Sequence, residues 1–315
     1  MVRSLISIGC ASMNNQDTWF CGLRLTNPIV VASGTVDYKV NPELAGVAGV
    51  VILKSLKEKA TFGSPQPRMA EVIKDDILEI DSNYTLDDLA DTIGLVNCIG
   101  LQGPGYKGFI DQYLPWYSHI FGRFMISIAG NSVNEYVNVL TGLRPFLGSF
   151  IAIEVNISCP NVEGGLAFGA DPQLTFELIS QLRKILSDKP KPMIVKLTPN
   201  VSERILLSVA GAAVGAGADA LSLINTIKVT AQMRDGRTIT GGLSGPIIFP
   251  IAQKLVWQVC NAFPKVPVIA GGGVFTAEQA KKMLDSGATL VSVGTLNFTR
   301  PDAVSNLIRD LESNN

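Results

Sequence analysis

The chain has 315 residues, and its 26 lysines and arginines nearly balance its 27 aspartates and glutamates. That length suits one large α/β barrel or two smaller domains, and no segment gathers enough basic residues to follow a phosphate backbone. No apolar run approaches the length of a membrane span, so we expect neither nucleic acid nor membrane as a partner.

The cysteines and histidines argue against both disulfides and zinc. The five cysteines form no C-x-x-C pair, and His119 is the sole histidine, so the chain lacks plausible zinc ligands. The first residues contain only a short apolar stretch mixed with serines, which does not resemble an export signal. We therefore expect reduced thiols and a cytoplasmic location.

Eight short apolar runs, each closed by Gly, Ser, Thr, Asn or Lys, predict eight strands. Their interiors are almost wholly apolar rather than alternating, which is typical of parallel strands covered on both faces. Helical patterns separate most of them and predict a single-domain (β/α)8 TIM barrel over residues 1–315. An open doubly wound sheet is the alternative, but no G-x-G-x-x-G follows an early strand. The strand ranges are 28–34, 49–55, 124–130, 150–158, 193–198, 220–226, 267–273 and 290–295, and helical ranges are 171–187, 202–216, 247–263 and 276–286.

Three stretches exceed the needs of a minimal barrel. Residues 4–24 resemble a β-hairpin, which we expect to plug the barrel floor. Residues 68–97, with an acidic segment at 75–91, and the polar, Gly-rich residues 228–246 predict long inserted loops. Long loops on a compact barrel usually serve as lids or surface insertions.

Two lysines stand out at the strand ends, where barrel enzymes place their catalytic groups. Lys54 and Lys196 each interrupt an otherwise apolar run. A buried ammonium is costly unless it meets an anion or a hydrogen-bonding partner, so we predict that both lysines point at a ligand. The alternative is a lysine that snorkels out of a strand end or pairs with a barrel carboxylate.

Glycine clusters at 241–245 and 271–273, together with Gly294-Thr295, predict a phosphate site. Glycine lets backbone N–H groups approach a phosphate, and the loops after the last two barrel strands commonly hold one. Ordinary turn chemistry is the alternative for any single cluster. The coincidence of the three favours a phosphate-bearing cofactor or substrate.

Cys159 directly follows the fourth predicted strand. A free cysteine is most often a buried structural thiol. Here Pro160 ends the strand and Gly164-Gly165 follow, so the sequence predicts a thiol on a flexible loop at the catalytic end of the barrel. We interpret Cys159 as functional. The structural interpretation is kept for Cys10, Cys21, Cys98 and Cys260.

A set of motifs spans nearly the whole chain, from Ala32-Ser33-Gly34 and Lys54 to Val293-Gly294-Thr295. Between them lie Asn-Ile-Ser-Cys-Pro-Asn-Val (156–162), Val-Lys-Leu-Thr-Pro-Asn (195–200), Ile-Asn-Thr (224–226), Gly-Gly-Leu-Ser-Gly-Pro (241–246) and Gly-Gly-Gly-Val (271–274). As a set they resemble the class 1 dihydroorotate dehydrogenases.

The resemblance implies an enzyme that binds FMN and oxidises (S)-dihydroorotate to orotate in pyrimidine synthesis. Cys159 would remove the C5 proton while FMN N5 takes the C6 hydride, under a loop that excludes water. Lys196 would stabilise the reduced flavin, and Lys54 would bridge the flavin and the substrate carboxylate. Besides the two lysines, the implied cofactor contacts are Ala32, Ser33, Gly34, Ser55, Ser127, Asn156, Gly245, Gly272, Gly273, Gly294 and Thr295. Besides Lys54, the implied substrate contacts are Asn97, Ile99, Gly100, Leu101, Asn156, Asn161, Asn225 and Thr226.

The segment Gly-Leu-Ser-Gly-Pro (242–246) is more like the 1B type than the fumarate-using 1A type. The 1B type implies a second subunit that carries FAD and an iron–sulfur cluster and passes electrons to NAD⁺, and we expect a homodimer of this chain. Gly103 and Ser127 depart from the family pattern, which often has Asn at both positions.

Two rival interpretations remain. A dihydropyrimidine dehydrogenase unit has similar flavin contacts but commonly has His where this chain has Asn161. A flavin-free barrel scaffold would have no reason to keep Cys159, Lys54 and Lys196.

Overall fold

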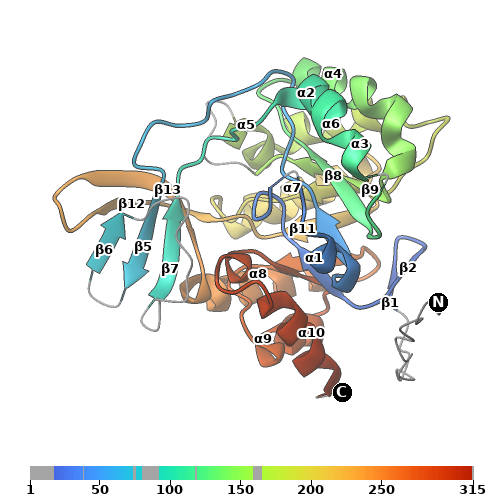
Figure 1. Ribbon diagram of the computed structural model, residues 1–315. Helices are drawn as coiled ribbons and strands as arrows, with labels where there is room; N and C mark the ends of the chain where they lie inside the picture. The colour runs from blue at the N-terminus through green and yellow to red at the C-terminus, as the bar shows by residue number, and fades with distance from the viewer. Residues whose placement is uncertain are drawn as a thin grey trace, which may run out of the picture.

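Eight parallel strands close into a barrel (Figure 1). The computed structural model describes residues 18–37, 39–73, 76–79, 92–117, 119–158 and 165–313. Each predicted strand range contains one barrel strand, so the predicted TIM barrel is confirmed and the doubly wound alternative is wrong. The strands are β3 (Ile29–Val31), β4 (Val50–Ile52), β8 (Phe124–Ile128), β9 (Ala152–Asn156), β10 (Met193–Lys196), β11 (Ala220–Leu223), β14 (Val268–Gly271) and β15 (Leu290–Val293). Their order around the barrel is β10-β11-β14-β15-β3-β4-β8-β9.

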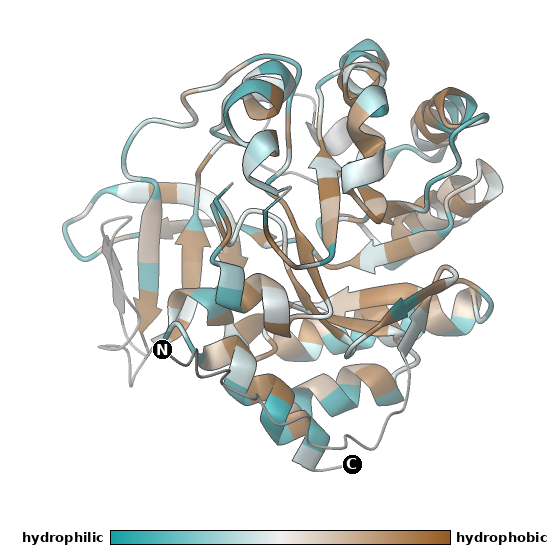
Figure 2. Ribbon diagram, turned by 45° about the vertical axis from the view of Figure 1, so that its right-hand side comes forward, coloured by the Kyte–Doolittle hydropathy of each residue, from teal (hydrophilic) through white to brown (hydrophobic). Residues whose placement is uncertain are grey.

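The barrel strands are buried on both faces, which explains their unbroken apolar sequences. On β9, Ile153 and Val155 belong to the core cluster that also contains helix residues, whereas Ala152 belongs to a second cluster inside the barrel. Figure 2 shows the barrel strands mostly in the brown of hydrophobic residues. Such double burial is the rule for parallel sheets.

Four helices lie within the predicted helical ranges, and three of them begin at polar caps. Asp171 caps α6 (Pro172–Ile185), Ser202 caps α7 (Glu203–Gly215), and Thr276 forms a capping box at α9 (Ala277–Asp285). The other helices are α1 (Pro42–Val47), α2 (Gly105–Gln112), α3 (Leu114–Tyr117), α4 (Val133–Leu143), α5 (Gly165–Ala170), α8 (Phe249–Ala262) and α10 (Ala303–Ser313), with a 3₁₀ helix η2 (Arg144–Ser149) after α4. Among the described residues, every helix is too short or too polar to cross a bilayer.

The N-terminal hairpin plugs the floor of the barrel, as predicted. Its strands are β1 (Thr18–Phe20) and β2 (Leu23–Leu25). Phe20 and Leu25 are 1% and 2% exposed and join the apolar cluster inside the barrel. Residues 4–17 of the predicted hairpin lie outside the described residues.

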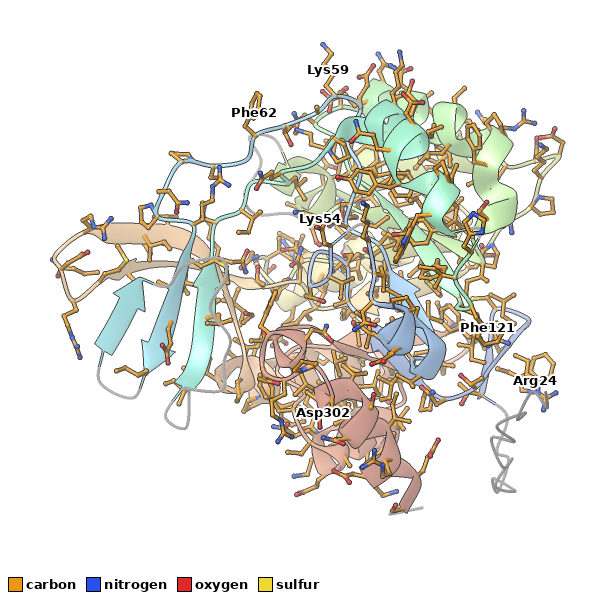
Figure 3. All side chains as sticks on the ribbon, in the orientation of Figure 1. Arg24, Lys54, Lys59, Phe62, Phe121 and Asp302 are labelled. Carbon is orange, nitrogen blue, oxygen red and sulfur yellow. The ribbon has the colours of Figure 1, made fainter. Side chains whose placement is uncertain are left out.

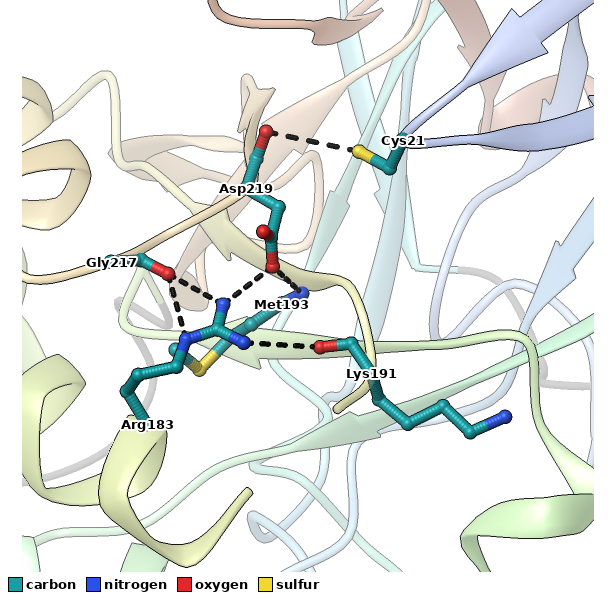
Figure 4. Close-up of polar contacts among 6 residues, drawn as sticks. All are labelled: Cys21, Arg183, Lys191, Met193, Gly217 and Asp219. Atoms are coloured by element: carbon teal, nitrogen blue, oxygen red, sulfur yellow. Dashed lines mark hydrogen bonds and ion pairs between the residues drawn. The ribbon is translucent and has the colours of Figure 1, made fainter. Parts of the chain in front are cut away.

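An ion pair ties elements together at the outer edge of this floor (Figure 4). Arg183 of α6 pairs with Asp219 and also donates to the carbonyl oxygen of Gly217. Asp219 accepts the backbone N–H of Met193 at 2.7 Å, at the start of β10. The Cys21 thiol faces the Asp219 carbonyl oxygen at 3.7 Å, and burial, together with the Asp219 charge, raises the pKa of Cys21 to about 12. Cys21 is therefore a protonated thiol at neutral pH, in keeping with its structural interpretation.

The described parts of the two long insertions are mostly strands, where the sequence predicted loops. They pair into one sheet beside the barrel, in the order β12-β13-β7-β5-β6 (Figure 1). Its strands are β5 (Met69–Ile73), β6 (Asp76–Glu79), β7 (Thr92–Asn97), β12 (Ile227–Gln232) and β13 (Thr238–Ser244). β12 alternates between half-buried and exposed residues, as an antiparallel strand with one wet face does. The polar composition of β12 is therefore similar to that of a loop. The strands of this sheet are also distant in sequence, because Asn97 of β7 and Gly242 of β13 pair across 145 residues.

We expect Phe20→Ala to lower the free energy of unfolding by about 3–5 kcal/mol, because it empties the apolar floor of the barrel. Trp19→Ala is the matched control, since Trp19 is the preceding residue on β1 and is 59% exposed. It should cost no more than about 0.5 kcal/mol. Denaturant unfolding measures both, and equal losses in the two variants would contradict the role of the hairpin as a plug.

Candidate functional site

A layer of polar side chains fills the barrel above its apolar floor. Side chains alternate between the two faces of a strand, so Ala152, Glu154 and Asn156 of β9 all point inward. Ala152 belongs to the apolar interior, whereas Glu154 and Asn156 are polar and at most 5% exposed. Across the strand register, Ser127 lies opposite Glu154, and Lys196 lies opposite Asn156. The interior therefore changes from apolar to polar toward the carboxyl ends of the strands, where barrel enzymes carry out their chemistry.

Glu154 lies at the centre of this layer and is wholly buried. Ser33 and Ser127 each donate a hydroxyl hydrogen bond to its Oε1 at 2.8 Å. Its Oε2 is also buried and accepts no hydrogen bond from a described residue. Glu154 is not among the site residues predicted from the sequence, although it is also a single charged residue in an apolar run, the same signal that singles out the two lysines.

A chain of hydroxyl and amide groups continues across the barrel. The hydroxyl oxygen of Ser55 lies 2.8 Å from that of Ser127, and Asn156 Nδ2 donates to Ser55 at 3.0 Å. Asn156 Oδ1 accepts the Ser158 hydroxyl at 2.8 Å. Asn225 Nδ2 donates to the same Ser158 hydroxyl oxygen at 2.9 Å. Four of the residues predicted from sequence thus belong to one hydrogen-bonded chain.

The two predicted lysines are held differently. Lys196 is 9% exposed, and its Nζ donates to Ser33 Oγ at 3.1 Å, so it reaches the barrel carboxylate only through a hydroxyl. Lys54 is half-buried and makes no hydrogen bond to a described residue. Burial lowers the pKa of Lys54, the charge of Asp37 opposes this shift, and Arg68 adds to it. Figure 3 labels Lys54 near the centre of the molecule, away from its periphery.

Asn97, Asn225 and Thr226 come together around Gly242 of β13. Asn97 Nδ2 donates to the Gly242 carbonyl oxygen at 3.1 Å, and Asn225 Oδ1 accepts the backbone N–H of Thr226 at 2.8 Å. A Cβ on Gly242 would lie 1.9 Å from Thr226 Oγ1, and one on Gly241 would lie 2.3 Å from the Asn97 carbonyl oxygen. These two glycines therefore allow close packing against Asn97 and Thr226, and the phosphate contact expected of the cluster 241–245 stays a prediction.

The segment 99–101 packs against the loop before the side sheet. The carbonyl oxygen of Ile99 accepts the N–H of Ser64 at 3.0 Å, and that of Leu101 accepts the Thr61 hydroxyl at 2.6 Å. Gly100 and Leu101 both have positive φ, of 71° and 52°. A leucine in this region is unusual, and such strain collects at ligand sites, so the segment is a suitable wall for a binding pocket.

The two departures from the expected motif leave the local hydrogen bonds intact. Gly103 and Thr61 exchange backbone hydrogen bonds at 2.9 and 3.0 Å, which need no side chain at position 103. The Ser127 hydroxyl is engaged inside the barrel with Ser55 and Glu154. The residues at positions 103 and 127 therefore leave the hydrogen bonds around them in place.

The remaining predicted glycines gather where two 3₁₀ turns begin. Gly245 precedes η3 (Pro246–Ile248) and Gly294 precedes η4 (Thr295–Phe298), and neither turn has a side-chain cap. The Thr295 hydroxyl donates to Ser244 Oγ at 3.0 Å and so links the two turns. A Cβ on Gly273 would lie 2.7 Å from the Gly245 carbonyl oxygen, and Gly272 also has positive φ, at 116°. Pro246 has no N–H, and the Ile248 N–H already donates to the Gly245 carbonyl oxygen at 3.2 Å. The N–H groups at the start of η4, beside backbone without side chains, therefore form the cradle for an anion.

The segment Ala32-Ser33-Gly34 adjoins this cradle at the end of β3. The Ala32 N–H donates to the Val293 carbonyl oxygen at 2.9 Å, and a Cβ on Gly294 would lie 3.8 Å from that of Ala32. Gly34 has φ of 84° and open space where a Cβ would stand. The cradle and the polar layer are therefore continuous through Ser33.

Cys159 and Asn161, the predicted base and a predicted substrate contact, lie outside the described residues, as does Cys10. Cys98 and Cys260 are free thiols, and burial raises the pKa of Cys260 to about 11. Cys260, like Cys21, is therefore protonated at neutral pH.

Comparisons with known proteins agree on one family. The family model described as dihydroorotate dehydrogenase matches residues 16–314. The chain is 39% identical over 303 residues to a protein of Geotalea uraniireducens, with 93% of this chain and 90% of the relative covered. It is 36% identical over 309 residues to a protein of Caldicellulosiruptor bescii, covering 95% and 93%. Both are named dihydroorotate dehydrogenase B (NAD(+)), catalytic subunit.

A solved structure gives the same fold at low sequence identity. It is a dihydroorotate dehydrogenase of Eimeria tenella in complex with ferulenol, with a TM-score of 0.74 and 18% identity. The match covers 94% of this chain and 82% of the other. This likeness supports the barrel fold alone.

We expect Lys54→Met to raise the free energy of unfolding at neutral pH by about 1 kcal/mol, because it removes a charged group from a site that disfavours it. The lowered pKa means that folded Lys54 loses its proton before unfolded lysine does. The burial penalty is therefore complete below the folded pKa and is relieved as pH rises through it. The stability difference between variant and parent should shrink toward pH 10. Unfolding curves at several pH values measure it, with the exposed Lys282→Met as control, and a gap independent of pH would contradict the prediction.

Proposed function

Because the chain belongs to the dihydroorotate dehydrogenase family and oxidises dihydroorotate to orotate in pyrimidine biosynthesis, we propose that FMN is its cofactor and Cys159 its catalytic base. The observation that carries this proposal is the buried polar layer at the carboxyl end of the barrel, which places Lys196, Asn156 and Asn225 beside a glycine cradle. We propose one FMN-binding domain for the whole chain.

The cradle fits the phosphate of FMN. Gly294 begins an uncapped turn whose first residues carry N–H groups, and Gly273, where a side chain would collide with the Gly245 backbone, lies in the same cradle, so the site offers N–H groups to an anion. Gly272 and Thr295 complete the proposed phosphate contacts. Ala32, Ser33, Gly34, Ser55 and Ser127 are the proposed neighbours of the flavin ring. When bound, FMN supplies the acceptor for the hydride that leaves C6 of the substrate.

The lysines suit two electrostatic tasks. Lys196 is held in the barrel by Ser33, and a fixed ammonium is suited to stabilise negative charge that develops on a reduced flavin. Lys54 is half-buried without a hydrogen bond from its ammonium to a described residue, so we propose that it binds the substrate carboxylate. Asn97, Asn225 and Thr226, with Asn156 and Asn161, present amide and hydroxyl groups for the pyrimidine edge. Backbone groups of Ile99, Gly100 and Leu101 form the remaining wall.

Cys159 is proposed to take the C5 proton. It follows Ser158, whose hydroxyl is hydrogen bonded to both Asn156 and Asn225, so the chain enters the predicted loop from the polar layer itself. A general base must reach the proton that it abstracts, and this starting point favours that geometry. Closure of the loop would exclude water and strengthen the polar contacts inside.

We propose that electrons leave through a second subunit. The relatives named above are catalytic subunits of a type B enzyme whose name includes NAD⁺. A partner that carries FAD and an iron–sulfur cluster would accept electrons from this chain and pass them to NAD⁺, and two copies of this chain would form the catalytic core. The free thiols of Cys21, Cys98 and Cys260 support a reducing compartment such as the cytoplasm.

The direct test is anaerobic reduction of the purified protein. It should carry a yellow chromophore absorbing near about 450 nm, as FMN in an oxidoreductase does. Dihydroorotate should bleach this absorbance, and dihydrouracil should not. Bleaching by dihydrouracil alone would favour the dihydropyrimidine dehydrogenase alternative, and a colourless protein that FMN cannot reconstitute would favour the scaffold.

Cys159→Ala should retain flavin but slow its reduction by dihydroorotate by about 10²–10⁴-fold, because loss of a general base has effects of this size. Stopped-flow absorbance measures the rate. Cys98→Ala is the control, since Cys98 is a half-buried thiol near the proposed pocket, and it should change the rate less than about threefold, within the small range of a substitution outside the chemistry. Unchanged reduction in Cys159→Ala would remove Cys159 from the base role.

The purified chain alone should reduce NAD⁺ at a rate at least about tenfold below that reached with its partner subunit, because the sequence has no iron–sulfur cluster motif and the proposed partner supplies the FAD and the cluster. Dihydroorotate-dependent NADH formation, measured with and without the co-expressed subunit, gives the ratio. Rapid turnover with fumarate and none with NAD⁺ in the complex would contradict the type B assignment of the acceptor.

A further inference from the structure

The buried carboxylate of Glu154 can only accept hydrogen bonds when ionised, and this sets the direction of every hydroxyl around it. Each serine hydroxyl has one proton. Ser33 and Ser127 both lie 2.8 Å from Glu154 Oε1, so both direct their proton to it. Their oxygens are then left to accept hydrogen bonds from the next groups outward.

On one side, the next group is an ammonium. Ser33 Oγ accepts from Lys196 Nζ at 3.1 Å while its proton points at Glu154. The hydroxyl therefore relays the negative charge of the carboxylate to the lysine. An ammonium inside a barrel needs such a counter-charge, because an unpaired buried charge is strongly unfavourable.

On the other side, the chain reaches an amide. The Ser127 proton is used by Glu154, so Ser55 must donate to Ser127, and Ser55 Oγ must then accept from Asn156 Nδ2 at 3.0 Å. The same amide orientation is required independently, because Asn156 Oδ1 accepts the backbone N–H of Ser158 at 3.2 Å. The orientation of the Asn156 amide that follows from Glu154 is therefore the same as the one that follows from the Ser158 backbone N–H.

We propose that Glu154 is a positioning residue of the active site, the common acceptor that holds the Lys196 ammonium through Ser33 and orients the Asn156 amide through Ser127 and Ser55. This inference rests on the proposed function, since it assigns Lys196 to the flavin and Asn156 to the pyrimidine. Glu154 makes no hydrogen bond of its own to Lys196 or Asn156 and reaches them through Ser33, Ser127 and Ser55.

The hydrogen bonds from Glu154 to Ser33 and from Glu154 to Ser127 can be removed by separate substitutions. Ser33→Ala removes the bridge to Lys196 without changing any charge, and Ser127→Ala removes the bridge to Asn156. We expect Ser33→Ala to lower the equilibrium constant for reduction of the bound flavin at least tenfold and to change orotate affinity little. Ser127→Ala should do the reverse: it should weaken orotate about tenfold and change the flavin equilibrium less than Ser33→Ala does. Equilibration with redox dyes and orotate titration of the flavin spectrum measure the two quantities in the holoenzyme.

Glu154→Gln separates positioning from simple electrostatics by the sign of its effect. Loss of a nearby negative charge acting through space would make the flavin easier to reduce. Loss of the anchor for Lys196 would make it harder to reduce, as in Ser33→Ala, and this is the expected result. In the double variant, Ser33→Ala should add little to Glu154→Gln, because both cut the same branch. Glu154→Asp, which keeps the charge, should recover part of the flavin equilibrium.

Three results would overturn the inference: an easier reduction in Glu154→Gln, additive effects of Ser33→Ala and Glu154→Gln, or an unchanged flavin equilibrium and orotate affinity in both single-serine variants.

If Glu154→Gln does not fold, the two serine variants test the inference alone. A wild-type protein that holds no flavin would refute the proposed function instead. In a flavin-free protein, the interaction energy between Ser33 and Glu154 can be obtained from the unfolding free energies of the single and double variants. An interaction energy near zero would also overturn the inference.

Discussion

A carboxylate buried inside a β-barrel is the constraint on which the rest of the site depends. Glu154 is wholly buried, and no described lysine or arginine contacts it directly. Its charge is instead spread through two hydroxyls into a network that ends at an ammonium on one side and at two amides on the other. In an interior of low dielectric such a network is strong when complete and costly when broken, so it specifies one arrangement of donors and acceptors.

The apolar floor makes this arrangement possible. The N-terminal hairpin closes one end of the barrel with Phe20 and Leu25, and the interior side chains above it are small or aliphatic. These floor residues are buried, and the polar layer lies above them, toward the carboxyl ends of the strands. The hairpin and the polar site are therefore connected through the inward-facing residues of the barrel strands, which contact the hairpin at one end and form the polar layer at the other.

The barrel could be predicted from sequence because each strand is buried on both faces and carries its own signal within about 5 residues. The side sheet could not, because Gly242 pairs with Asn97 from a distant part of the chain and its polar alternation looks like a loop. The lysines, asparagines and later glycines were predicted as members of a site, and of these Lys196, Asn156 and Asn225 belong to one hydrogen-bonded network. Glu154 was missed because a single acid within a strand was interpreted as part of the apolar run.

The glycines illustrate why position in a motif does not determine role. Gly241 and Gly242 belong to the same run as Gly245, yet a Cβ on Gly241 would strike the Asn97 backbone of β7, and one on Gly242 would strike the Thr226 side chain. Gly245 instead has φ of 97° at the start of an uncapped turn. A Cβ on Gly245 would also lie 2.8 Å from Gly94 Cα, so close packing acts on all three glycines, and the positive φ is what distinguishes Gly245. The run joins the side sheet to the cradle, so the sheet that resembled a loop in the sequence sets the position of one wall of the proposed cofactor site.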